Sequence, residues 1–290
     1  MFKKLTSTEG GRGLLLISPP FFYALALMAF PLGAIILFSF WTQNFMDVDT
    51  TFTLNNYREI ITQPIYGALL QRSLYVSAVV TVVTVLLAFP IAYFVSFHVR
   101  PDRKSLWLFL ITIPFWTSYL IRVFLWKVIL GYNGVINTGL LNIGLIDEPL
   151  TFILYNVNAV IITLAHAFAP FAILPIFVAL EKIDRSLLEA SRDLGENKVM
   201  TFFRVTLPLA MPGVVAAVLI VFIPTIGDYV TPELMGGAGG KLIANMIQTQ
   251  FLALNNAPLG AALAVVAMLS VTAISLMFVL LNRRWLRGRS

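Results

Sequence analysis

The feature that most constrains this 290-residue chain is a set of long, nearly uncharged apolar runs. A helix needs about 20 such residues to cross the ~30 Å hydrocarbon core of a bilayer. Six runs are long enough, and they lie at about residues 14–41, 68–97, 105–130, 152–180, 207–227 and 259–281. None alternates apolar and polar residues with a period of two, which argues against a β-barrel. The runs predict an all-α, polytopic membrane protein with six transmembrane helices.

Composition supports the same class. Hydrophobic residues make up 59% of the chain and charged residues only 12%, against about 25% charged in an ordinary soluble domain. This excludes a typical soluble enzyme, a disordered segment and a nucleic-acid-binding module, so no nucleic-acid partner is expected. No internal repeat or linker divides the sequence, so residues 1–290 are expected to form a single transmembrane domain. The first run is too long for a signal peptide and is expected to be a retained span.

The basic residues predict the orientation of the spans. Fifteen of the 20 Lys and Arg residues lie on one side: Lys3, Lys4, Arg12, Arg100, Arg103, Lys104, Lys182, Arg185, Arg192, Lys198, Arg204, Arg283, Arg284, Arg287 and Arg289. Loops rich in Lys and Arg stay in the cytoplasm. Both termini are therefore expected in the cytoplasm. The opposite loops carry a net charge of −5, which is either the mirror image of this bias or a mouth that attracts cations.

Residues that carry catalysis are scarce. The chain has no cysteine and two histidines, and no metal-ligand or nucleophile motif is present. The segment Gly236–Lys241 superficially resembles a phosphate-binding loop, but Met235 stands at the first glycine position and Leu242 replaces the Ser or Thr that holds magnesium. We expect a flexible loop there. The sequence thus predicts no enzyme activity, no catalytic residues, no metal site and no cofactor in this chain.

The largest predicted cytoplasmic loop, residues 181–206, carries a short helix signal. Ser186 and Glu189 have the spacing of a capping box, and Gly195 stands where a left-handed residue ends a helix. The expected helix is 187–194, with Leu187, Ala190 and Leu194 on one face; so short a helix needs a partner surface. A second amphipathic stretch follows at 198–205, before Pro208 opens the next span.

This loop resembles a known motif. Glu189-Ala190-Ser191, then three residues, Gly195, then nine residues and Val205-Thr206-Leu207-Pro208 look like the EAA loop of the permease subunits of ABC importers. Ser191 and Val205 depart from the usual alanine and isoleucine. The resemblance implies a coupling helix that fits a cleft in a cytoplasmic ATPase. The residues implied to couple to the ATPase are Glu189, Ala190, Ser191, Arg192, Asp193, Leu194 and Gly195.

The resemblance extends along nearly the whole chain. Residues 114–122, 188–195 and 232–237 all look like the spermidine/putrescine branch of these permeases. That branch implies the type I importer fold, a multi-pass location in the bacterial inner (plasma) membrane, and a second homologous permease. It also implies two copies of an ATPase that binds ATP and magnesium, and a periplasmic solute-binding protein. The implied function is polyamine import by alternating access, driven by ATP hydrolysis in the partner subunit. Opines, amino acids and related amines remain alternative solutes.

Two groups of residues are candidates for the path of a cation. In the third run Trp116 and Tyr119 share a helical face with Val123 and Trp126. At the outer end of the fifth run stand Asp228, Tyr229 and Glu233. A carboxylate beside aromatic rings suits an ammonium group, and a carboxylate at membrane depth indicates function. The alternatives are core packing for the aromatic stripe and an interfacial acid within an aromatic belt.

Two other classes of protein were weighed against the importer. A secondary transporter driven by an ion gradient would need buried coupling-ion sites or inverted repeats with broken helices. An intramembrane enzyme would need a catalytic constellation. Neither signal is clear in this sequence, which favours the permease.

Overall fold

The computed structural model describes residues 9–45 and 47–286, and helices dominate it. Five helices are long and apolar enough to cross a membrane, or six if one bent pair forms a single span. This confirms the all-α, polytopic class. Lys3, Lys4, Arg287 and Arg289, which contribute to the predicted orientation, lie outside the described residues. By packing, the chain divides into two compact units, residues 1–64 with 249–266 and residues 65–248 with 267–290.

The smaller unit is built around the first helix. Its elements are α2 (Glu9–Phe38), β1 (Thr42–Asn44), β2 (Asp47–Asp49), α3 (Asn55–Thr62), the π-helix η4 (Thr249–Ala253) and the first part of α14 (Ala257–Leu281). The strands pair antiparallel, with Gln43 opposite Val48. The buried Asn56 amide donates to the carbonyls of Ser39 at 2.9 Å and Trp41 at 2.7 Å. These bonds hold the chain beyond Phe38 outside the helix, so the first span ends before the predicted Trp41.

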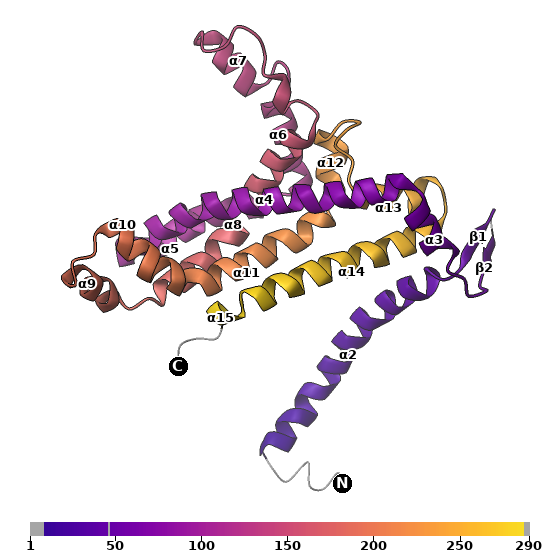
Figure 1. Ribbon diagram of the computed structural model, residues 1–290, viewed down its shortest axis with the longest axis horizontal. Helices are drawn as coiled ribbons and strands as arrows, with labels where there is room; N and C mark the ends of the chain where they lie inside the picture. Colours follow the sequence, from indigo (N-terminus) through magenta and orange to yellow (C-terminus); the bar gives the residue numbers. More distant parts are fainter. Residues whose placement is uncertain (1–8, 46, 287–290) are drawn as a thin grey trace. The chain divides into compact units, whose positions relative to one another are not determined.

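The larger unit holds the remaining elements. They are α4 (Pro64–Phe97), α5 (Pro101–Thr112), η1 (Ile113–Trp116), α6 (Tyr119–Ile129), α7 (Val135–Asn142), η2 (Thr151–Ile153), α8 (Val157–Glu181), α9 (Arg185–Asp193), α10 (Lys198–Thr201), η3 (Phe202–Thr206), α11 (Leu207–Ile226), α12 (Val230–Met235), α13 (Ile243–Gln248), the rest of α14, and α15 (Arg283–Leu286). In this unit α4, α8 and α11 run together (Figure 1) and share one apolar core, which includes Val80, Ala88, Leu164, Ile176 and Val221.

Helices α8 and α11 approach each other closely at Gly213. A Cβ atom at this position would lie 2.5 Å from the Pro175 carbonyl oxygen and 2.5 Å from the Ala179 Cβ. Such distances are far inside van der Waals contact, so only glycine permits this spacing of the two backbones. Small residues serve the same purpose at many helix contacts in membranes, where close packing replaces the hydrophobic effect.

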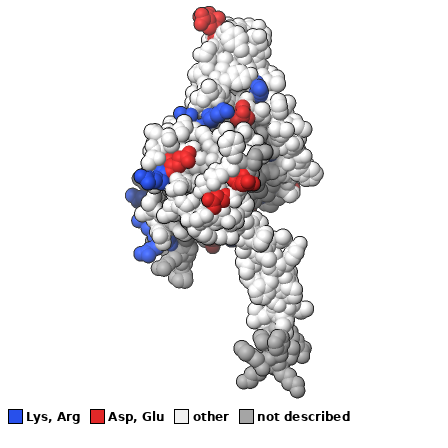
Figure 2. Space-filling view, turned by 90° about the vertical axis from the view of Figure 1, so that its right-hand side faces the viewer, with Lys and Arg blue, Asp and Glu red and all other residues white. Residues whose placement is uncertain are grey.

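The surface of the long helices is largely apolar, as contact with a bilayer requires. Large apolar side chains stay exposed along the long helices, as at Phe30 (81%) and Leu86 (68%). Figure 2 shows that Lys, Arg, Asp and Glu occupy only small patches of the face in view, and most of it is uncharged. Since water would penalise such a surface, lipid or partner helices must cover it.

The third span departs from the prediction of one helix over 105–130. The residues form two segments, 101–116 and 119–129, bent by 89°. Pro114 lies in the 3-10 turn η1, and Thr117 and Ser118 have extended ψ angles of 148° and 137°. Proline offers no N–H to the preceding turn, so the helix has a local reason to break here. The expectation that Trp116 continues the face of Tyr119 is therefore wrong.

Two other boundaries also differ. Helix α8 begins at Val157 rather than residue 152, because the Asn156 side chain accepts from the backbone of Asn158 and Ala159 and caps it. Residues 198–226 form one continuous helical segment, so the amphipathic stretch 198–205 and the fifth span are not separate. A π-helical turn, Phe202–Thr206, joins them just before Pro208; such turns often mark functional positions in helices.

Candidate functional site

The short helix of the predicted cytoplasmic loop exists, with a different start. Helix α9 runs Arg185–Asp193, and Asp184 caps it by accepting from the Ser186 N–H at 3.0 Å. The predicted capping box is therefore wrong, because Ser186 lies within the first turn. Glu189 consequently sits in the middle of the helix, and Asp184 supplies the negative charge that the helix start favours.

The end of α9 confirms the prediction for Gly195. Its φ angle is +89°, a left-handed conformation that side chains with a Cβ rarely adopt. The Gly195 N–H donates to the Arg192 carbonyl at 2.8 Å, and the Glu196 N–H donates to the Ser191 carbonyl at 3.2 Å. These two bonds make a Schellman motif, which satisfies the last carbonyls and turns the chain sharply away from the helix.

Helix α9 has one face held by the protein and one left open. Ser191 is buried, and its hydroxyl bonds the Thr201 hydroxyl at 3.1 Å. Glu196 pairs with Arg204 across the same turn. On the open face Leu187 is 47% exposed and Leu194 86% exposed. The other predicted coupling residues that are exposed are Glu189, Ala190, Arg192, Asp193 and Gly195.

Asp184 gives a testable account of how this helix begins. Hydrogen bonds from the Ser186 backbone and side chain lower the pKa of the Asp184 carboxyl. A lowered folded-state pKa means a stabilisation that is complete above the ordinary value near 4 and lost as the pH falls through the folded-state pKa. We expect Asp184→Ala to speed amide hydrogen exchange at residues 185–189 several-fold at pH 7. Asp184→Asn should exchange like the wild type, since asparagine caps equally well; equal exchange in all three proteins would contradict the cap.

A polar cluster lies where α6 meets the end of α11. The Tyr119 hydroxyl donates to Asp228 Oδ2 at 2.7 Å and shares a 2.6 Å hydrogen bond with the Thr231 hydroxyl. Asp228 Oδ1 accepts from the Val230 N–H at 3.1 Å. Each carboxylate oxygen has two lone pairs, so Asp228 keeps acceptor capacity for a further donor. Sequence reasoning placed Tyr119 behind Asp228 on one proposed path; Thr231 was missed.

The other candidate path residues contact different partners. Trp116 is 77% exposed and packs edge-on against Phe109. Glu233 accepts from the Asn245 amide at 3.2 Å and lies 3.9 Å from Lys241 Nζ. Tyr229 is 44% exposed, and its carbonyl accepts from Asn245 at 2.9 Å.

The Arg122 side chain contacts two aromatic rings, one of which is the Tyr119 ring of this cluster. The Arg122 guanidinium lies 5.3 Å from the Phe115 ring centre and 5.7 Å from that of Tyr119. Within the described residues its Nε and one terminal nitrogen are buried without a hydrogen-bond acceptor. Arg122 thus places a positive charge against the ring of Tyr119, the residue that donates to Asp228.

The glycine-rich loop is not the flexible segment expected. The Arg72 side chain donates to the carbonyl of Gly239 at 2.8 Å and to that of Lys241 at 3.3 Å. The Ile243 N–H donates to the buried Ser73 hydroxyl at 2.8 Å. Helix α4 thus holds the second half of this loop.

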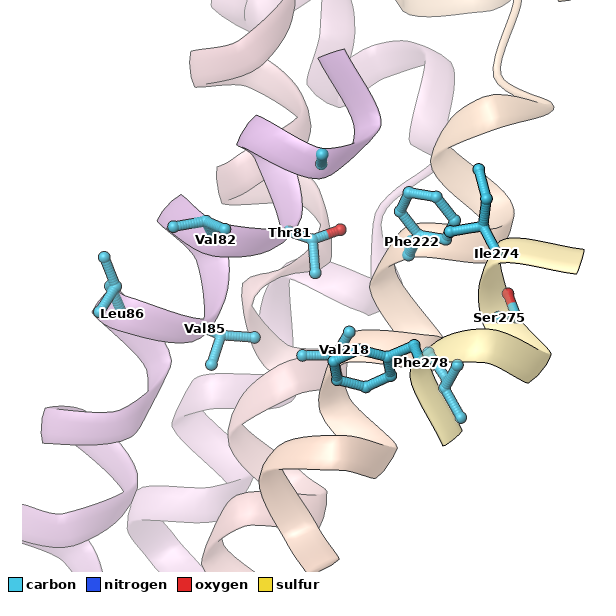
Figure 3. A pocket seen from close by; sticks show the side chains of 11 residues that line it. Thr81, Val82, Val85, Leu86, Val218, Phe222, Ile274, Ser275 and Phe278 are labelled. Carbon is cyan, nitrogen blue, oxygen red and sulfur yellow. The ribbon is translucent and has the colours of Figure 1, made fainter. Parts of the chain in front are cut away.

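The larger unit also contains an apolar pocket of about 340 Å³ between α4, α11 and α14. Figure 3 shows Val85, Val218, Phe222 and Phe278 around it. The Thr81 hydroxyl in its wall already donates to the Ser77 carbonyl at 2.7 Å. Such a lining offers no carboxylate to a cation, so the polar cluster is the better solute site. Within residues 9–45 and 47–286, no group of three His, Cys, Asp or Glu side chains could hold a metal ion.

Long apolar helices, a broken third span and a short exposed helix between α8 and α11 define a multi-span membrane protein. The family model described as "Binding-protein-dependent transport system inner membrane component" matches residues 61–287. The chain belongs to this family of transport permeases.

Curated relatives agree with this assignment. The chain is 40% identical over 215 residues to the spermidine/putrescine transport system permease protein PotB of Escherichia coli (strain K12), which covers 74% of this chain and 77% of that protein. It is 41% identical over 213 residues to PotB of Haemophilus influenzae, covering 73% of each chain. It is 33% identical over 238 residues to the inner membrane ABC transporter permease protein YdcU of E. coli, covering 78% of this chain and 75% of that one.

Solved structures agree on the fold. A chain of a bacterial alginate ABC transporter, crystallised in complex with an alginate pentasaccharide-bound periplasmic protein, matches with a TM-score of 0.74 and 17% identity. The match covers 98% of this chain and 97% of that one. At this identity the likeness shows the fold alone, which is that of an ABC transporter permease.

Proposed function

We propose that this chain is a permease subunit of an ATP-driven importer that moves polyamines such as spermidine and putrescine into the cytoplasm. The observation that carries the proposal is the 40% identity to spermidine/putrescine permeases over about three quarters of both chains. The Tyr119–Asp228 cluster suits this substrate class, since a carboxylate next to an aromatic ring attracts ammonium groups by charge and by cation–π contact.

The proposal assigns the work to separate subunits. This chain would pair with a second homologous permease, and both termini would lie in the cytoplasm. Two copies of an ATPase would bind ATP and magnesium, so this chain itself needs no cofactor. A periplasmic solute-binding protein would deliver the polyamine. Helix α9 would dock into the ATPase through its open face. Leu194 on that face is exposed, and it lies outside the apolar helix that begins at Lys198.

Reconstitution tests this assignment. Proteoliposomes with both permeases, the ATPase and the binding protein should accumulate labelled spermidine only with ATP inside. Vesicles holding this chain alone should accumulate none. Uptake by the chain alone along a proton or sodium gradient would overturn the importer assignment in favour of a secondary transporter. Preference for an amino acid or an opine over spermidine in the full system would overturn the substrate.

A further inference from the structure

Three charged side chains and one serine form a hydrogen-bonded cluster where α9 begins. The Glu181 carboxylate at the end of α8 accepts from Lys104 Nζ through both oxygens, at 2.7 Å and 2.9 Å. Glu181 Oε1 also accepts from the buried Ser96 hydroxyl at 2.6 Å. Arg185, the first residue of α9, reaches the same oxygen at 3.4 Å.

Arg185 also contacts the end of α4 directly. Its guanidinium donates to the Ser96 carbonyl at 3.1 Å and lies 3.8 Å from the Phe97 ring centre. The cluster is partly sheltered from water, since the Lys104 side chain is 17% exposed, that of Glu181 32% and that of Arg185 41%. Ion pairs in such surroundings hold their geometry better than pairs on an open surface.

The cluster connects α9 to helices that do not adjoin it in the sequence. Helix α9 is joined to α8 by the residues 182–184 and to α10 by the residues 194–197. Neither α4 nor α5 is next to α9 in the sequence. Glu181 and Arg185 therefore connect α9 to two further helices that its own chain connections do not reach.

We propose that Glu181, with Lys104 and Arg185, is a positioning group that transmits displacement of α9 to the cytoplasmic ends of α4 and α5. The inference rests on the proposed docking of α9 to the ATPase. When the ATPase moves α9, these contacts carry α4 and α5 with it, so that closure of the ATPase changes several spans together. Energetic coupling between sites needs such a contiguous set of contacts with a defined geometry.

Lys104→Met is the sharpest variant, because Glu181 keeps Ser96 and Arg185 as partners and no buried charge is left unpaired. In the complete importer in proteoliposomes, the spermidine moved per ATP hydrolysed should fall about tenfold, within the range typical of site-to-site coupling. The amount of ATPase that copurifies should not change. Asp102→Asn is the matched control on the same helix, since Asp102 forms an exposed pair with Arg100; it should leave both quantities unchanged.

A distance measurement supplies a second readout. The chain contains no cysteine, so spin labels at Ser105→Cys on α5 and Ser186→Cys on α9 would be unique to this subunit, given cysteine-free partners. With Lys104 present, the distance between the labels should stay constant when ATP binds. With Lys104→Met or Glu181→Gln it should change on ATP binding, because α9 then moves without α5.

The outcomes separate the two proposals. If the wild-type chain does not copurify with the ATPase or import spermidine, the proposed function fails. If the wild type works and both variants keep the wild-type ratio and the constant label distance, only the role of Glu181 fails. If one variant does not assemble, the other decides.

Discussion

Replacing Gly195 by aspartate should uncouple ATP hydrolysis from transport while leaving the chain in the membrane. The φ angle of +89° costs a residue with a Cβ roughly 1–2 kcal/mol, so the Schellman turn should open and change the direction in which the chain leaves α9. The open face of α9, with Leu194 at its end, would no longer fit the ATPase. We expect spermidine uptake to fall by about tenfold to a hundredfold, the span of a typical coupling free energy, measured as uptake per ATP hydrolysed in proteoliposomes.

The chain offers a matched control for this variant. Helix α7 also ends in a Schellman motif, in which Gly144 has φ +69° and the Leu145 N–H donates to the Leu140 carbonyl at 3.0 Å. Neither Gly144 nor Gly195 has a neighbouring atom that an added Cβ would meet. Gly144→Asp therefore applies the same strain and charge in a predicted outer loop, and should leave coupling intact. Normal coupling in Gly195→Asp, or an equal loss in both variants, would contradict a special role for α9.

Asp228→Asn should raise the KM for polyamine uptake by roughly tenfold to a hundredfold. A hydrogen bond to a charged group contributes about 1.5–3 kcal/mol, and 1.4 kcal/mol corresponds to a factor of ten. Asparagine can still accept from the Val230 N–H, so the start of α12 should survive. Uptake measured against spermidine concentration, with subunit assembly checked by copurification, gives the result.

Two further variants separate the role of this carboxylate from general electrostatics. Asp147→Asn removes one negative charge from an exposed position in a predicted outer loop, and it should change KM little unless the net charge of the outer face alone attracts the cation. Tyr119→Phe removes the hydrogen bond to Asp228 Oδ2 and should have an intermediate effect. An unchanged KM in Asp228→Asn would exclude the cluster from the solute path.

The spans could be predicted because each depends on a local property, the length of an apolar run. Gly195 could be predicted for the same reason, since its left-handed conformation follows from its place after a short helix. The break at Thr117 could not, because the run 105–130 stays apolar through it and proline often bends a membrane helix without ending it. Asp184 and Ser186 are both good capping residues, and only the surrounding chain decides between them.

The contacts that define the candidate sites were beyond the reach of sequence patterns. Tyr119 and Asp228 are 109 residues apart, and Lys104 and Glu181 are 77 apart. Such pairs depend on how α5, α6, α8 and α11 pack, and no repeat or spacing in the sequence encodes that packing. The sequence shows which charged or polar group each residue carries, but it does not show which residue that group contacts.

The continuous helix over residues 198–226 connects the region of α9 to the region of Asp228. At 1.5 Å per residue its 29 residues extend for about 43 Å, which exceeds the ~30 Å of hydrocarbon by about two turns. One end lies close to α9 in the sequence, and the other stops two positions before Asp228. In the proposed importer, a tilt that the ATPase imposes on this helix would reorient the Asp228 carboxylate directly, with no separate loop between them.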